Sequence, residues 1–280
     1  MRIAVTGSKG QLGSALQVAL QGHDLLLIDL PENDITQLAA TRASLAGFGP
    51  EVVIHAAAMT NVDGCEKDPQ AAYRLNVLGT RNVAVAALEC DAAMVYISTD
   101  YVFDGRKAEP YWEWDDCSPL SVYGRTKWNG ERVVQQLCAR AYIVRIAWLY
   151  GQGPRNFPQT VLRLADERGR LQMVTDEVGS PTYAADVAEA LGLLVQQPAY
   201  GIYHLPNSGV CSRYEWAREI LARTGRSHVE LIATEKYVRA ARVPAHAELR
   251  NFCGAEIGIT MRPWREALNA YLAANGLLVS

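Results

Sequence analysis

Short runs of apolar residues alternate with stretches of helical spacing along the first half of the chain. The apolar runs lie at residues 2–6, 24–29, 51–55, 93–98 and 142–148. Runs of this length, bounded by glycine and polar residues, are typical of buried strands. Between them, apolar residues recur every three or four positions, as they do on one face of a helix. Strands that alternate with helices predict an α/β fold with a parallel sheet wound on both faces.

The pattern changes beyond Gly151, where the strand-like segments become shorter. We interpret residues 1–150 as one domain and residues 151–280 as a smaller C-terminal α/β lobe. The boundary is approximate, and a return of the chain from one lobe to the other is compatible with the pattern. In the second part, strands are expected near 171–174, 201–205 and 229–232, and helices near 156–168, 183–196, 212–224 and 263–275.

Glycines follow the first predicted strand, at the point where a helix is predicted to begin. Gly7 would permit a tight turn, Gly10 would let a pyrophosphate approach the backbone, and Gly13 would allow the helix to pack closely on the strand. The spacing is GxxGxxG, which differs from the GxGxxG of the simplest dinucleotide-binding fold. A strand, a glycine turn and a helix in this order indicate a Rossmann-like doubly wound sheet that binds a dinucleotide.

An acidic residue ends the second predicted strand. Asp29 lies 16 residues after Gly13, where a carboxylate can bind the hydroxyls of an adenosine ribose and would repel a 2′-phosphate. This position favours NADH over NADPH without excluding NADPH, and the alternative is a solvated loop aspartate. Small residues at 56–60 follow the third strand and leave room for a flat ligand.

Hydroxyl groups and one amine occupy the ends of later elements. Tyr123 and Lys127 are four residues apart on a predicted helix, so both side chains project from the same face. A nearby cation eases ionisation of a tyrosine, and Thr99 ends the fourth strand, facing the crevice where ligands bind. Reduction of a ketone develops negative charge on oxygen, which such donors can stabilise.

Two other features leave alternatives open. Asn76 lies in the middle of a helix predicted at 69–90, where either a structural kink or a proton-relay role would account for it. Residues 100–120 lack periodicity, and a loop this long is usually a lid or disordered. Its aromatic residues, Tyr111, Trp112 and Trp114, favour a lid.

Composition and charge narrow the class of protein. The 280 residues are 49% hydrophobic and 20% charged, as in ordinary globular proteins. A formal charge of −3 and a pI near 6.0 argue against nucleic acid or an anionic membrane as the main partner. No apolar run is long enough to span a membrane, the N-terminus does not read as a signal peptide, and the six scattered cysteines suggest reduced thiols without a metal site. These features predict a cytoplasmic protein.

Together these residues resemble the extended short-chain dehydrogenase/reductase superfamily and, within it, the dTDP-4-dehydrorhamnose reductase family. The resemblance is carried by STDYVFDG at 98–105, SPLSVYG at 118–124, Asn156-Phe157 and DEVGSPT at 176–182, and it extends from residue 2 to about residue 275. It implies reduction of a 4-keto sugar nucleotide by NAD(P)H, with residues 151–280 binding the substrate. Neither a metal-free homodimer nor a monomer is excluded.

The resemblance also implies roles for single residues. Tyr123 would be the general acid, Lys127 would hold the nicotinamide ribose, and Thr99 would bind the substrate carbonyl. Asp100, Tyr101 and Trp148 would join Thr99 and Tyr123 in contacting the sugar. Besides Tyr123 and Lys127, the implied cofactor-binding residues are Gly7, Gly10, Gln11, Leu12 and Gly13 at the pyrophosphate, Asp29 at the ribose, Asp34 and Ile35 at the adenine, and Ala57, Ala58, Met59, Thr60 and Asn76.

The sequence departs from the family pattern in the second lobe. Glu177 stands where the family often has glutamine, and the usual Arg-Pro-x-x-Ser-x-Leu pattern is degraded at 242–249. A related sugar-nucleotide reductase or epimerase with another sugar is therefore an alternative. A non-catalytic alternative is a nucleotide-binding regulatory subunit of the methionine adenosyltransferase type, which shares the fold.

Overall fold

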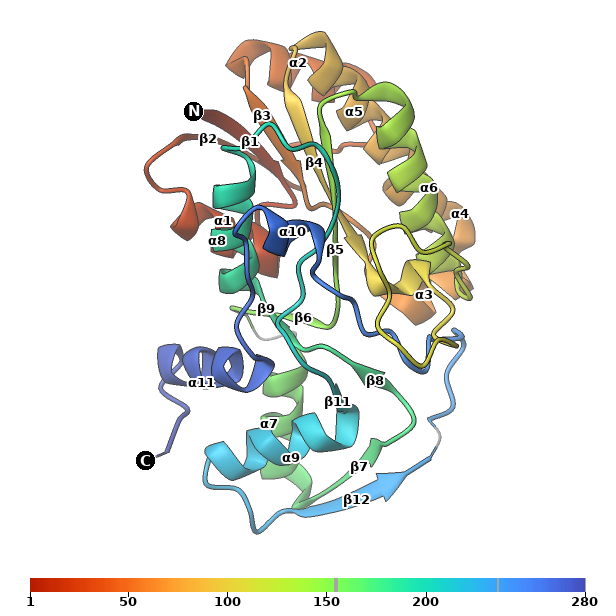
Figure 1. Ribbon diagram of the computed structural model, residues 1–280, viewed down its shortest axis with the longest axis vertical. Coiled ribbons are helices and arrows are strands. Elements are labelled where there is room, and N and C mark those ends of the chain that lie inside the picture. Colours follow the sequence, from red (N-terminus) through yellow and green to blue (C-terminus); the bar gives the residue numbers. More distant parts are fainter. Residues whose placement is uncertain (154–155, 236, 280) are drawn as a thin grey trace.

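The computed structural model describes residues 1–153, 156–235 and 237–279. A six-stranded sheet occupies the upper part of the molecule, and a smaller group of helices and short strands lies below it (Figure 1). All neighbouring strands in the large sheet are parallel. Their order is β10 (Gly201–His204), β5 (Ala141–Ile146), β4 (Ala93–Thr99), β3 (Val52–His55), β1 (Arg2–Thr6) and β2 (Asp24–Ile28).

Helices cover both faces of the sheet, which confirms the doubly wound α/β fold (Figure 1). Successive side chains of a strand point to opposite faces. In β1, Ile3 and Val5 belong to one buried cluster and Ala4 to another. Two covered faces explain why the strands read as continuous apolar runs. The helices of this part are α1 (Gln11–Ala19), α2 (Leu38–Phe48), α3 (Val62–Lys67), α4 (Pro69–Tyr73), the π-helix η1 (Arg74–Gly79), α5 (Thr80–Glu89), the 3₁₀-helix η2 (Asp100–Val102), α6 (Val122–Leu137), α8 (Ala184–Leu194) and α10 (Cys253–Glu256).

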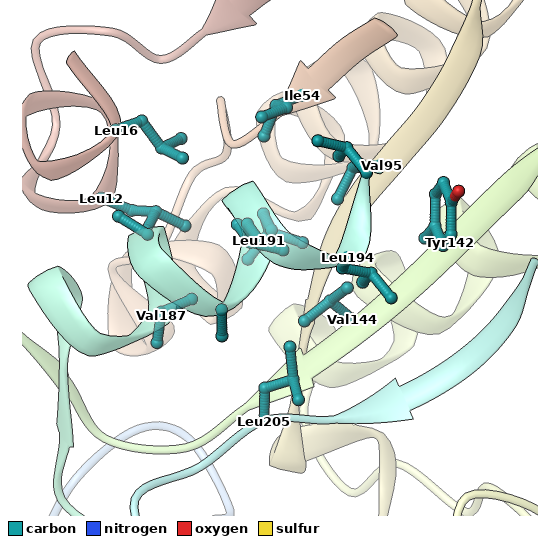
Figure 2. Close-up of a cluster of buried hydrophobic side chains, with 14 of the residues drawn as sticks. Leu12, Leu16, Ile54, Val95, Tyr142, Val144, Val187, Leu191, Leu194 and Leu205 are labelled. Atoms are coloured by element: carbon teal, nitrogen blue, oxygen red, sulfur yellow. The ribbon is translucent and has the colours of Figure 1, made fainter. Parts of the chain in front are cut away.

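Strand β10 is part of the large sheet and helix α8 packs on it, although the sequence pattern places both elements in the second lobe. Leu191 of α8 packs into one cluster with Leu12 of α1 and Val95 of β4 (Figure 2). Strand β10 pairs with β5, from Gly201 opposite Tyr142 onward. Helical spacing shows that a helix has an apolar face, but it does not identify the surface that this face contacts.

The second lobe is built from the remaining elements, around a core rich in aromatic residues. Trp216, Trp264 and Tyr271 are fully buried in it. The elements are β6 (Leu149–Tyr150), α7 (Phe157–Arg168), β7 (Arg170–Val174), β8 (Val178–Gly179), β9 (Thr182–Tyr183), β11 (Cys211–Ser212), α9 (Arg213–Arg223), β12 (Glu230–Thr234) and α11 (Trp264–Ala274). None of the helices in the described ranges combines the length and apolar character that a membrane span requires.

The predicted helix at 69–90 is divided into three pieces, and Asn76 lies in the middle piece, η1. Its side-chain oxygen accepts a hydrogen bond from the Met59 N–H at 2.7 Å, and its amide donates to the Met59 carbonyl at 3.1 Å. The amide also donates to Thr126 Oγ1 at 2.9 Å. Asn76 thus ties a π-helical turn to the loop after β3 and to α6, which favours the structural interpretation of this residue.

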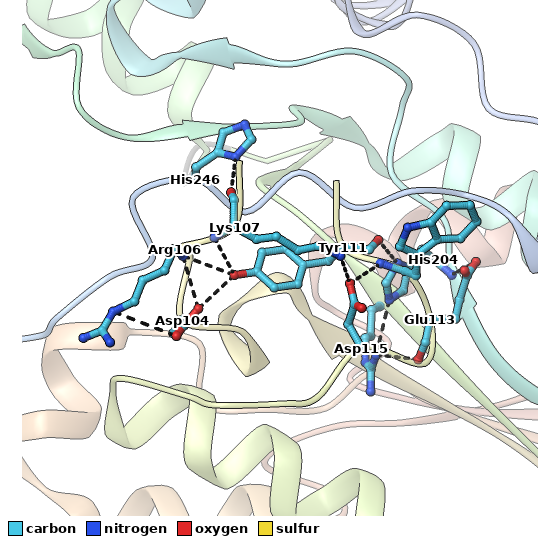
Figure 3. Close-up of polar contacts among 10 residues, drawn as sticks. Asp104, Arg106, Lys107, Tyr111, Glu113, Asp115, His204 and His246 are labelled. Carbon is cyan, nitrogen blue, oxygen red and sulfur yellow. Dashed lines mark hydrogen bonds and ion pairs between the residues drawn. The ribbon is translucent and has the colours of Figure 1, made fainter. Parts of the chain in front are cut away.

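The loop at 100–120 is held against the C-terminal segment (Figure 3). The Tyr111 N–H donates to the Glu248 carbonyl at 2.7 Å, and the Glu113 carboxylate accepts from the Phe252 N–H at 3.0 Å. The structure describes all of residues 102–120, and none of them lines the large cavity at the carboxyl ends of the strands, which is described below. Of the aromatic residues that favour a lid in the sequence, Trp112 and Trp114 pack instead on one another and on Phe252, and Tyr111 stacks on Phe103.

Candidate active site

A cavity of about 840 Å³ opens where the chain reverses its direction across the sheet. From β1 the chain passes to β2 on one side and then to β3 on the other. The carboxyl ends of β1 and β3 therefore diverge at a switch point, which is where open α/β sheets bind ligands. The cavity is lined both by loops of the large sheet and by residues of the second lobe, including Trp148 and Arg213.

The glycine turn after β1 is in direct contact with the loop after β3. Gly7 has a φ of +70°, and a Cβ there would lie 2.7 Å from the backbone nitrogen of Ala57. A Cβ on Gly13 would lie 2.2 Å from the Gly7 carbonyl oxygen. Only glycine fits both positions without moving the backbone. The N-cap residue of α1 is Gly10, which has no side chain to accept a hydrogen bond from the first N–H groups of the helix. This start of the helix lines the cavity.

Asp29 lies just after β2, at the edge of the cavity. Its carboxylate accepts hydrogen bonds from the Lys9 N–H at 2.7 Å and the Leu30 N–H at 2.8 Å. The Lys9 ammonium is bound to Glu32 at 2.9 Å. The carboxylate is thus held in place by one backbone N–H of the glycine turn and by that of the next residue, Leu30.

Helix α6 places Tyr123 and Lys127 in the cavity opposite Thr99, the last residue of β4. The hydroxyl of the N-cap, Ser121, accepts a hydrogen bond from the Gly124 N–H at 3.1 Å. A Cβ on Gly124 would lie 2.2 Å from the carbonyl oxygen of Tyr101, so the first turn of α6 packs directly on η2. This contact brings the helix close to the end of β4.

Burial governs the protonation of both helix residues. It raises the pKa of Tyr123 well above its ordinary value, and the contact with Thr99 works in the opposite direction. It lowers the pKa of Lys127 to about 7, which the charge of Glu131 partly offsets. The ammonium lies 4.2 Å from the ring centroid of Tyr96. The expected easing of Tyr123 ionisation by Lys127 is therefore outweighed by desolvation, and the phenol keeps its proton at neutral pH.

Asp100 presents a buried carboxyl beside Thr99. One of its oxygens accepts a hydrogen bond from the Thr99 hydroxyl at 2.9 Å. The other, Oδ2, is buried and has no hydrogen-bond partner among the described residues. Burial raises the pKa of Asp100 to about 7. A buried acceptor without a partner is costly unless a ligand supplies a donor.

Most residues that the sequence predicts for the site do line this one cavity. They come from the carboxyl ends of four strands, β1 to β4, from the start of α6 and from the entry to the second lobe. Met59 and Asn76 do not line it, and their cofactor-binding roles stay predictions. The predicted residues that line it are Gly7, Gly10, Gln11, Leu12, Gly13, Asp29, Asp34, Ile35, Ala57, Ala58, Thr60, Thr99, Asp100, Tyr101, Tyr123, Lys127 and Trp148.

Sequence reasoning missed two charged residues of the cavity, Lys9 and Arg213. Lys9 lies inside the glycine turn, and this position was the only feature of the sequence that pointed to a place in the cavity. Arg213 follows Ser212 at the start of α9, far along the chain from the other site residues. No spacing connects Arg213 with them, because only the fold of the second lobe brings it to the sheet edge.

Comparisons with known proteins agree with this geometry. The family described as the RmlD substrate binding domain matches residues 1–276. The chain belongs to this family. A dTDP-4-dehydrorhamnose reductase of Mycolicibacterium smegmatis is 38% identical over 283 residues, covering 98% of this chain and 85% of that protein. The spore coat polysaccharide biosynthesis protein SpsK of Bacillus subtilis is 39% identical over 274 residues, covering 97% and 96%.

Solved structures lead to the same family. A dTDP-4-dehydrorhamnose reductase of Clostridium acetobutylicum has a TM-score of 0.96 at 38% identity, covering 99% of this chain and 100% of that one. The enzyme of Bacillus anthracis, solved in complex with NADP, has a TM-score of 0.95 at 36% identity, covering 98% and 99%. These relatives confirm the resemblance seen in the sequence.

Proposed function

We propose that the chain reduces the C4 keto group of dTDP-4-dehydro-6-deoxy-L-mannose to give dTDP-L-rhamnose, with NAD(P)H as the reductant. The observation that carries the proposal is the meeting of Thr99, Tyr123 and Lys127 in the cavity that the glycine turn also lines. Relatives of similar length that are named dTDP-4-dehydrorhamnose reductase support it.

The proposed reaction needs one hydride and one proton. NAD(P)H, when bound, would supply the hydride that C4 of the sugar accepts. The hydroxyls of Thr99 and Tyr123 bind the C4 oxygen, and the Tyr123 phenol gives its proton to that oxygen as negative charge develops. Burial keeps this phenol protonated at neutral pH, as a proton donor requires. Lys127 would bind the nicotinamide ribose when the cofactor is bound.

The residues present fit a dinucleotide. There is no room for a Cβ at Gly7, so the backbones of the loops after β1 and β3 lie close together at the border of the cavity. The start of α1 adds N–H groups and the positive end of a helix dipole, which suit a pyrophosphate. Within this site we propose that Asp29 favours NADH, because its carboxylate, held by two backbone N–H groups, would lie close to a 2′-phosphate.

The Asp29→Ala variant tests this cofactor preference. Removing the carboxylate should shift the ratio of kcat/KM values by about tenfold toward NADPH, since a like-charge repulsion is removed. Initial rates with both cofactors, at saturating sugar nucleotide, measure the ratio. The Asp24→Ala variant is the control, because Asp24 is an exposed residue at the other end of β2. An unaltered ratio in Asp29→Ala would remove Asp29 from the preference.

Turnover with the purified chain tests the function itself. Incubation with the 4-keto sugar nucleotide and NADH or NADPH should consume the cofactor and yield dTDP-L-rhamnose, identified by chromatography and mass spectrometry. Binding of cofactor without consumption would instead indicate a nucleotide-binding subunit. Turnover only with a different keto sugar nucleotide would assign the chain another substrate.

A further inference from the structure

Arg213 projects into the cavity from the start of α9. The helix start is fixed by a capping box, in which the Ser212 hydroxyl accepts from the Glu215 N–H at 3.1 Å and the Glu215 carboxylate accepts from the Ser212 N–H at 2.8 Å. Arg213 follows Ser212 directly and is the first residue of the helix. Its backbone position is therefore set by the cap, independently of any ligand.

The guanidinium lies on an aromatic surface. Its central carbon is 3.5 Å from the ring centroid of Trp148 and 5.2 Å from that of Phe157. Planar guanidinium groups stack on aromatic faces in this way, which orients their N–H groups toward the sides. Trp148 itself is constrained, since its φ is +43° and a Cβ on Gly179 would lie 2.6 Å from its ring. The ring on which the Arg213 guanidinium lies is therefore held in a fixed position.

The hydrogen-bonding capacity of Arg213 is unused within the described part of the chain. Its side chain donates no hydrogen bond to any residue there, and its nearest carboxylate oxygen, on Glu177, is 3.7 Å from Nε. That side chain is only 20% exposed. A guanidinium carries five N–H donors, and withdrawing them from water without acceptors is unfavourable. These donors therefore call for an acceptor from a ligand.

The local charge balance identifies the acceptor as an anion. Glu177 is shared by two guanidinium groups, because Arg239 binds its other oxygen at 2.5 Å. Two positive charges therefore face one carboxylate. Asp100 is the next acid near Arg213, and burial raises its pKa to about 7, so it does not fully balance the second cation at neutral pH. The surplus charge at this end of the cavity is positive.

We propose that Arg213 binds the diphosphate group of the nucleotide-sugar substrate. The inference rests on the proposed function and adds a residue to it. The C4 oxygen of the sugar would lie at Thr99 and Tyr123, and the diphosphate is attached at C1, across the sugar ring. Arg213 lies on the side of the second lobe, beside Trp148, where this group would extend. A guanidinium can bind two phosphate oxygens at once.

Calorimetric titration of the full-length protein with dTDP and with thymidine tests the proposal without turnover. Arg213→Gln should weaken dTDP binding by at least about tenfold and leave thymidine binding unchanged, since thymidine has no phosphate. Arg213→Lys should lose less affinity, because it keeps the charge but not the planar fork. The affinity of the wild-type protein for dTDP should fall more steeply with NaCl than that of Arg213→Gln.

Arg218→Gln is the matched control, because it removes the same charge from an exposed position on the same helix. Circular dichroism and NADH binding verify that each variant is folded. If Arg213→Gln does not fold, the dTDP affinity of Arg213→Lys still tests the proposal. Unchanged dTDP affinity in both Arg213 variants would overturn the proposal. A higher KM for the sugar nucleotide with unchanged dTDP affinity would also overturn it, by assigning Arg213 to the sugar.

The proposed function is checked separately by wild-type turnover and wild-type dTDP binding. If the wild-type protein reduces the sugar nucleotide and the Arg213 variants bind dTDP normally, only the role of Arg213 is wrong. If the wild-type protein neither binds dTDP nor reduces the sugar nucleotide, the proposed function is wrong, and the role of Arg213 is overturned with it.

Discussion

Tyr123 is 9% exposed, lines the cavity opposite Thr99, and carries its proton at neutral pH because burial raises its pKa. In the proposed reaction this residue gives up a proton and does not need to be ionised beforehand. A high pKa would oppose a tyrosine that acts as a base in the free enzyme. The direction of the shift therefore suits ketone reduction, in which the phenol is the donor.

Tyr123→Phe is expected to lower kcat by about 10²–10⁴-fold, because it removes the proton donor while keeping the ring. The dissociation constant for NADH, measured by fluorescence titration, should stay within about twofold of the wild-type value. Tyr200→Phe serves as the control, since Tyr200 is partly exposed and does not line the cavity. Near-normal turnover of Tyr123→Phe would show that another group donates the proton.

Lys127 gives a prediction for stability against pH. Burial lowers its pKa to about 7 in the folded protein, against about 10.4 in an unfolded chain. Between these values the unfolded state binds more protons, so this residue makes stability rise with pH, by about 1.4 kcal/mol for each pH unit. Lys127→Met lacks this contribution. Its free energy of unfolding in urea, relative to wild type, should be higher at pH 6.5 than at pH 9.

A difference between Lys127→Met and wild type that is the same at pH 6.5 and pH 9 would mean that Lys127 keeps an ordinary pKa in the folded state. Lys67→Met is the control, because Lys67 is an exposed lysine at the end of α3.

Residues that local geometry brings to the cavity could be predicted from the sequence, and residues that distant packing brings there could not. Gly7, Tyr123 and Lys127 have neighbours along the chain that reveal their setting. The effect of burial on Tyr123 was not predictable, because desolvation depends on every element that surrounds the phenol. Arg213 was not predictable either, since the other residues of the cavity lie at least 60 positions away along the chain.

At the scale of elements, the sequence predicts the strands and helices well but not all of their partners. The apolar spacing of residues 183–196 predicts the helix that forms at Ala184–Leu194. It does not show that this helix covers the large sheet beside α1 (Figure 2). A structural kink at Asn76 was one of two interpretations of the sequence, but its π-helical form was not predictable, since the hydrogen bonds of Asn76 reach Met59 and Thr126.

Leu191→Ala is expected to lower the free energy of unfolding by about 2–5 kcal/mol, because Leu191 is fully buried between α8 and the sheet. Urea denaturation followed by circular dichroism measures the change. Leu193→Ala on the same helix is the control, since its side chain is 54% exposed, and it should change the value by less than about 0.5 kcal/mol. Equal effects of both substitutions would mean that α8 is not packed as described.

At the scale of the whole molecule, the large sheet is completed by chain that follows the first part of the second lobe. Strand β10 closes one edge and α8 covers one face, and both come after β9 in the sequence (Figure 1). The boundary predicted near residue 150 is approximate and allows the chain to return from one lobe to the other, but it does not say which residues return. Residues in the range 184–204 make this return, because α8 and β10 pack with the N-terminal half.

A fragment of residues 1–150 is therefore expected not to fold stably on its own. It would lack the helix that covers Leu12, Leu16 and Val95, and it would expose the edge of β5. Its near-ultraviolet circular dichroism should lack the fixed aromatic signal of the full chain, and trypsin should degrade it at least about tenfold faster. A cooperative thermal transition in this fragment would contradict the expectation.

The interleaved course of the chain also limits how substrate preference can be inherited between relatives. A recombination event with one crossover near residue 150 would join β5 from one parent to β10 from another, and α1 to a foreign α8. Such a hybrid would need compensating substitutions at the β5–β10 pairing and at the α1–α8 contact before it could fold around a new pocket. Substitution of single pocket residues avoids this obstacle, so variation in preference should accumulate at pocket positions more readily than by exchange of whole lobes.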